Sequence, residues 1–151
     1  MKQLCSREMA ELNRSYKETE ILYAKYAASC GVSTTTVCVL YSLYTSDAPC
    51  TQTQLAEDWG IPMQTVNSCL KALEKSGAVR LDFAEGSRKS KHILLTGQGE
   101  ALAQRIIAPL VRSENAAFGS LTPEEQQQLL SIMKKHNNLL PHYLFGSHTE
   151  R

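Results

Sequence analysis

The sequence has no long apolar run and no apolar segment after its first methionine. A bilayer span needs roughly 20 consecutive apolar residues, and no run in the chain approaches that length. The residues that follow Met1 are polar and charged, unlike the apolar region of a signal peptide. We therefore expect a cytoplasmic protein that has no membrane partner.

Metal-binding and disulfide patterns are missing as well. The five cysteines are odd in number and form no C-x-x-C pair, which argues against a disulfide framework and a zinc site. His136, His142 and His148 are spaced six residues apart, which is not a zinc-ligand spacing. We expect no metal and no cofactor, with the cysteines reduced and packed as small apolar residues.

Motifs of the common enzyme chemistries are also missing. The chain has no Ser/His/Asp arrangement, no paired-carboxylate motif and no glycine-rich loop that could cradle a phosphate. We therefore predict no catalytic residue and no enzyme activity.

The net charge is small, but the basic residues are unevenly distributed. The whole chain carries a formal charge of +1. Residues 71–92 hold six basic and three acidic side chains, so this segment carries +3 and the remainder carries −2. A local basic patch on a nearly neutral chain favours binding at specific nucleic-acid sites over general coating of nucleic acid.

The apolar spacing predicts a mainly helical chain with one β-hairpin. With 151 residues, 42% of them hydrophobic, the chain suits a single domain, 1–151. Pro109 is expected to kink the fifth helix, and Thr122, Pro123 and Glu125 form a strong start for the sixth. The predicted helices cover about 7–29, 34–45, 51–58, 62–76, 97–117 and 123–141, and the predicted strands cover 78–83 and 91–95.

Residues 52–71 have the pattern of a helix-turn-helix. Ala56 is small enough for two helices to cross closely, and Gly60 can adopt the left-handed backbone of the turn. Pro62 can set the start of the second helix. The expected apolar anchors on the inner faces are Leu55, Trp59, Ile61, Val66, Cys69 and Leu70.

The second helix is predicted to read DNA, and the hairpin after it to grip the backbone. Asn67 and Gln64 carry amides that can pair with an adenine edge in the major groove. An arginine at the tip of a thin β-ribbon can enter a minor groove. The predicted DNA-binding residues are Thr53, Met63, Gln64, Thr65, Asn67, Ser68, Lys71, Arg88, Lys89 and Lys91.

Over about residues 50–105 the chain resembles the MarR family of bacterial regulators. The most specific segments are LEKSG, after the second helix of the motif, and LLTGQG, after the hairpin. The resemblance implies a recognition helix at Pro62–Ser76 and a wing at Ala84–Lys91 with Arg88 at its tip. It is also the main reason to predict a buried helix over 34–45, since the β-branched residues there favour a strand.

The expected fold is therefore a winged helix-turn-helix lobe, 34–98, flanked by dimerisation helices in 1–33 and 99–151. The resemblance implies a homodimeric repressor that binds a palindromic double-stranded operator and responds to a ligand. A small aromatic or phenolic effector is the expected ligand, and the pocket candidates are Tyr16, Tyr23, Tyr41 and Tyr44. Two alternatives stay open: a winged helix that binds proteins, and a redox sensor that uses a thiol such as Cys5.

Overall fold

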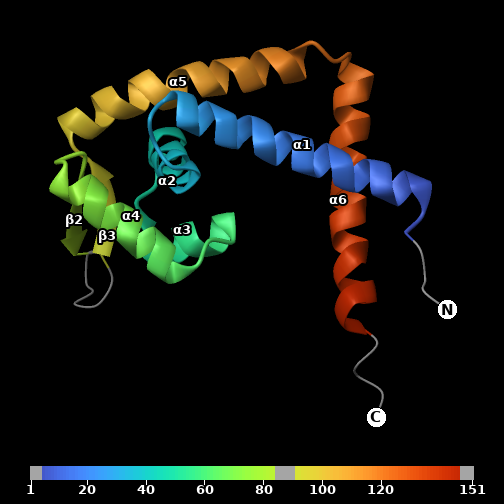
Figure 1. The fold of residues 1–151 in the computed structure, drawn as a ribbon, viewed down its shortest axis with the longest axis horizontal. Coiled ribbons are helices and arrows are strands. Elements are labelled where there is room, and N and C mark those ends of the chain that lie inside the picture. The colour runs from blue at the N-terminus through green and yellow to red at the C-terminus, as the bar shows by residue number, and fades with distance from the viewer. Residues whose placement is uncertain (1–4, 84–90, 147–151) are drawn as a thin grey trace. The chain divides into compact units, whose positions relative to one another are not determined.

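The computed structural model describes residues 5–83 and 91–146. The chain divides into two compact units, 1–109 and 110–151, and the boundary falls within α5, directly after Pro109. Figure 1 shows the helices and strands of the described residues and labels all of them except β1. They are α1 (Arg7–Ser29), α2 (Thr34–Thr45), β1 (Cys50–Thr51), α3 (Gln52–Trp59), α4 (Met63–Lys75), β2 (Val79–Phe83), β3 (Lys91–Leu95), α5 (Gly97–Gly119) and α6 (Pro123–Phe145).

A small antiparallel sheet closes the first unit. Its strand order is β1–β3–β2, so the hairpin strands pair with each other and β3 also pairs with β1. Ile93 lies opposite Cys50 on one side and Leu81 on the other. The hairpin confirms the predicted strands, whereas β1 was not predicted, because a two-residue strand is too short to show alternation.

The segment 34–45 is the helix α2, as the family resemblance implied. The Ser33 hydroxyl caps it by accepting a hydrogen bond from the Thr36 backbone N–H at 3.0 Å. The helix buries Val37, Val39 and Leu40. Burial of this apolar face outweighs the weak preference of β-branched residues for strands.

The core of the winged lobe joins α2, α3, α4 and the sheet. Its buried residues are Val39, Cys50, Leu55, Ala56, Val66, Leu70, Leu73, Ala78, Val79 and Ile93. Ile61 and Cys69 pack against this core, as predicted. Trp59 was predicted to be an inner anchor, and this is wrong: at the end of α3 it is 41% exposed and contacts Tyr41 instead.

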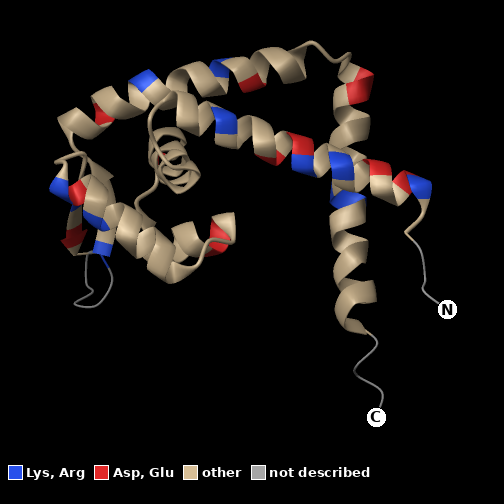
Figure 2. Ribbon diagram, in the orientation of Figure 1, with Lys and Arg blue, Asp and Glu red and all other residues tan. Residues whose placement is uncertain are grey.

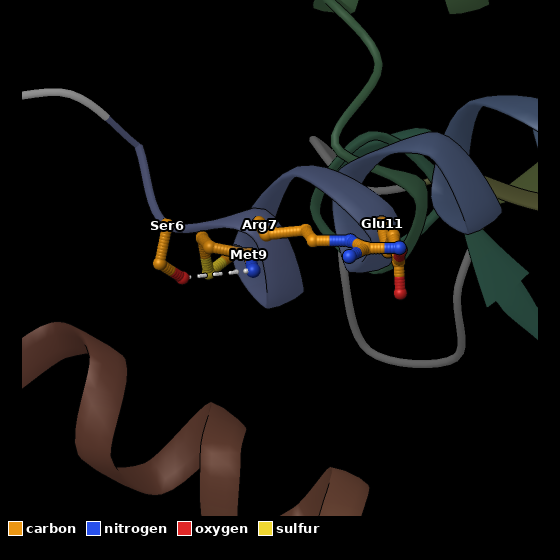
Figure 3. A network of polar contacts seen from close by, with 4 residues as sticks. All are labelled: Ser6, Arg7, Met9 and Glu11. Carbon is orange, nitrogen blue, oxygen red and sulfur yellow. Dashed lines mark hydrogen bonds and ion pairs between the residues drawn. The ribbon is translucent and has the colours of Figure 1, made fainter.

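Helix α1 begins at a capped end and is tied to α5. The Ser6 hydroxyl accepts a hydrogen bond from the Met9 N–H, and Arg7 pairs with Glu11 one turn later (Figure 3). The Tyr26 hydroxyl donates to the Ile106 carbonyl at 2.6 Å, which holds α1 against the part of α5 that belongs to the first unit.

Helix α6 in the second unit begins as predicted but ends later. The Thr122 hydroxyl accepts from the Glu125 N–H, and the Glu125 carboxylate accepts from the Thr122 N–H at 2.8 Å, so the predicted capping box is present. The predicted end near Pro141 is wrong, because the helix continues through this proline to Phe145. Pro141 lies in the last turns of an exposed helix, where water can satisfy the carbonyl that loses its donor.

None of the helices in 5–83 and 91–146 is both long enough and apolar enough to cross a bilayer.

Candidate nucleic-acid interface

The first helix of the motif and the turn after it have the predicted geometry. Thr51 and Gln54 form a capping box at the start of α3. Gly60 ends the helix with φ 60° and ψ 30°, the left-handed conformation that favours glycine. The Ile61 N–H then donates to the Ala56 carbonyl at 3.0 Å, so the chain turns directly over the small buried alanine.

The second helix, α4, is held from within the lobe. Val66, Leu70 and Leu73 are buried along one side of it. Pro62 occupies the N-cap position of α4, but its side chain makes no capping hydrogen bond. Instead the Gln52 side chain on α3 donates to the Met63 carbonyl at 3.3 Å and ties the first turns of the two helices together. Sequence reasoning missed Gln52, since no local pattern marks a contact across 11 residues.

The opposite side of α4 carries the predicted base-reading residues. Met63, Gln64, Thr65, Ser68 and Lys71 are exposed there, and Asn67 is half-buried. The Ser68 hydroxyl donates to the Gln64 carbonyl at 2.9 Å, so its remaining capacity is to accept a hydrogen bond. Thr53 is exposed on the first turn of α3. This side therefore offers amide donors and acceptors, a hydroxyl and one cation, which is the chemistry that base edges and phosphates bind.

The hairpin adds positive charge beside α4, which packs against β2 (Figure 1). Lys91 places its ammonium 5.2 Å from the centre of the Phe83 ring, a cation–π contact. Phe83, at the end of β2, is 63% exposed. Arg80 pairs with Asp82 on β2. Arg88 and Lys89 lie outside the described residues.

Charges of both signs gather at this end of the lobe. Figure 2 shows basic and acidic residues mixed over the hairpin and the neighbouring helix end. The described basic residues between 71 and 92 are all exposed, and they are Lys71, Lys75, Arg80 and Lys91.

The four tyrosines proposed as a ligand pocket lie on two helices, α1 and α2. Tyr41 lines a cleft with Trp59 at the ends of α2 and α3. Tyr44 donates its hydroxyl proton to the Gln104 side chain at 2.9 Å, which links α2 to α5. Tyr16 and Tyr23 lie on α1 and do not line that cleft.

The cysteines differ in their surroundings. Burial raises the pKa of the Cys38, Cys50 and Cys69 thiols, although a hydrogen bond with Thr36 opposes the effect at Cys69. Cys5 is exposed and so is not packed as predicted. Within the described residues no three His, Cys, Asp or Glu side chains gather as a metal site would require.

Comparison with known proteins identifies the same region. A family described as winged helix-turn-helix DNA-binding matches residues 40–80. The HTH-type transcriptional repressor Rv2887 of Mycobacterium tuberculosis is 29% identical over 82 residues, which are 54% of this chain. The match spans 59% of that repressor's length.

Solved structures extend the likeness to the whole fold. A MarR family regulator from Neisseria meningitidis, NMB1585, has a TM-score of 0.80 at 19% identity, over 94% of this chain and 99% of its own. A MarR family protein from Listeria monocytogenes, solved with a 26mer DNA, has a TM-score of 0.70 at 18% identity, over 100% of this chain and 98% of its own. The named relatives are regulators rather than enzymes. Residues 40–80 thus match a winged helix-turn-helix DNA-binding family, and the chain has the fold of the MarR family regulators.

Proposed function

We propose that the protein is a transcriptional repressor that binds a palindromic double-stranded operator as a homodimer. The observation that carries this proposal is the two-sided character of α4. Val66, Leu70 and Leu73 anchor one side in the core, while the other side presents polar groups to solvent. A helix that binds a protein partner would expose a more apolar face, so this polarity favours DNA over the protein-interaction alternative.

The dimer is supported by apolar side chains that the single chain leaves exposed. On α1 these are Ile21 and Leu22, and on α6 they include Leu130, Ile132, Tyr143, Leu144 and Phe145. Exposed apolar patches of this kind are typical of association surfaces. A two-fold dimer would place two recognition helices in successive major grooves, with half-site centres about 10 bp apart.

Two substitutions on α4 separate base reading from phosphate binding. Gln64→Ala removes an exposed amide, so discrimination between the operator and unrelated DNA should fall by about 1–3 kcal/mol. Lys71→Ala should weaken binding to all sequences alike. It should also reduce the slope of the logarithm of the binding constant against the logarithm of the salt concentration by about 1. Lys134→Ala on exposed α6 removes the same charge outside the winged lobe and is the matched control.

The measurement is fluorescence anisotropy with labelled upstream DNA and with a scrambled duplex, each at several salt concentrations. Equal effects of Lys71→Ala and Lys134→Ala, or affinity that does not change with salt, would contradict the assignment of α4.

The dimer is tested separately by Ile132→Glu on α6, where the side chain is 64% exposed. A charge placed in an apolar interface should shift the protein toward monomer in sedimentation and weaken operator binding with it. If the double variant Ile132→Glu, Leu130→Glu is still a dimer, α6 does not form the dimer interface. Release from DNA by an aromatic or phenolic effector belongs to this proposal and is measured in the same anisotropy assay.

A further inference from the structure

A cleft of about 380 Å³ opens in the winged lobe where the C-terminal ends of α2 and α3 meet. Tyr41, Ser42 and Thr45 line it from α2. Gln54, Asp58 and Trp59 line it from α3. The volume lies within the range of pockets that hold small molecules.

One wall of the cleft is a fixed pair of aromatic rings. The Trp59 indole N–H donates to the Ser42 hydroxyl at 2.7 Å. The Tyr41 and Trp59 rings meet edge to face, with centroids 5.9 Å apart and an interplanar angle of 82°. Because both contacts hold the indole in place, a ligand that stacks on its exposed surface does not have to immobilise it. Such a surface attracts cations through its negative π face.

The electrostatics of the cleft are negative. Asp58 supplies a carboxylate, and the described residues that line the cleft include no Lys or Arg. Both helices end there without a basic residue in the last turn, and helix C-termini carry partial negative charge. Figure 2 shows acidic and no basic residues on α3. The Asp58 charge also acts on Cys50 inside the cleft, where burial first and this carboxylate second raise the pKa of the thiol.

We propose that this cleft binds a small organic cation that carries an aromatic ring, such as a benzylammonium compound. The cationic group lies beside Asp58 and against the Trp59 ring, and Gln54 and the α2 hydroxyls complete the polar side. The same negative lining disfavours phenolates and aromatic carboxylates. Gly60, which begins the turn into α4, directly follows Trp59, so the ligand would contact the last residue of α3 before this turn.

The single tryptophan of the chain makes the test direct, because Trp59 is the only indole that can respond. Benzyltrimethylammonium, benzyl alcohol and benzoate are titrated into the full-length protein at low salt while tryptophan fluorescence is followed. The expected result is a saturable change with the cation alone. Asp58→Asn should weaken cation binding roughly fivefold. Glu57→Gln is the matched control, since it removes the neighbouring carboxylate, which does not line the cleft.

Calorimetry with Trp59→Leu provides a second readout that does not depend on fluorescence. This variant should lose the binding heat of the cation while its circular dichroism spectrum stays that of the parent protein. Equal responses to the cation, the alcohol and the carboxylate would overturn the proposal. Equal weakening by Asp58→Asn and Glu57→Gln, or unchanged heat in folded Trp59→Leu, would overturn it as well.

Discussion

Two glycines in the first turn of α5 have very different surroundings. A Cβ added to Gly99 would lie 1.8 Å from the carbonyl oxygen of Ala78 and 2.8 Å from its carbonyl carbon. A Cβ added to Gly97 would meet no atom within 4 Å. The Ala78 oxygen already accepts from the Thr96 N–H at 3.1 Å. Gly99→Ala must therefore push α5 away from the turn that joins α4 to β2.

The magnitude follows from what this displacement breaks. Forcing an extra methyl group into a packed contact costs about 1–3 kcal/mol. A lost Thr96–Ala78 hydrogen bond adds about 1 kcal/mol, and the higher helix propensity of alanine returns up to about 1 kcal/mol. Gly99→Ala should thus lower the free energy of unfolding by about 1–4 kcal/mol. Gly97→Ala, in open space, should leave it unchanged or raise it by up to about 1 kcal/mol.

Urea unfolding of both variants, followed by Trp59 fluorescence, measures the difference within the winged lobe itself. The expected order of midpoints is Gly97→Ala at or above the parent protein, with Gly99→Ala clearly below it. Equal midpoints for the two variants would refute the close approach of α5 to Ala78.

The other predictions concern the start of α6 and the thiols. Thr122→Ala removes the capping box and should cost about 1 kcal/mol of stability, measured by thermal unfolding; no loss would contradict the cap. At pH 8 iodoacetamide should label Cys5 before it labels Cys38, Cys50 and Cys69. The reason is that the raised pKa values of these three thiols leave less thiolate to react. Mass spectrometry measures the labelling rates, and equal rates would count against this prediction. Because the thiol pKa values are raised in the folded protein, the unfolded chain loses its thiol protons at a lower pH than the folded protein does. The contribution of these thiols to the free energy of unfolding should therefore be constant below the ordinary thiol pKa of about 8.5 and fall as the pH rises above it, which urea unfolding at several pH values measures.

The sequence predicted those parts of the fold that local chemistry determines. Gly60 and Ala56 marked the turn because only certain residues fit a left-handed backbone and a close helix crossing. What it could not predict depends on contacts between distant segments. Trp59 has the spacing of a core residue, yet Ser42, 17 positions earlier, holds its indole at the surface. Pro141 is a strong local stop signal, but it does not end a helix in which water can replace the missing bond.

Both ends of α4 are held by hydrogen bonds between backbone groups and side chains that lie outside the helix. The residues on the exposed side of α4 are therefore free to vary. At its start, Gln52 bonds the Met63 carbonyl. After its end, the Thr96 hydroxyl donates to the Gly77 carbonyl at 2.5 Å, and the same hydroxyl accepts from the Gly99 N–H. None of these bonds uses the solvent-facing side chains of α4, so substitutions there need not move the helix. The fold can accordingly be shared at a TM-score of 0.80 with only 19% of residues identical.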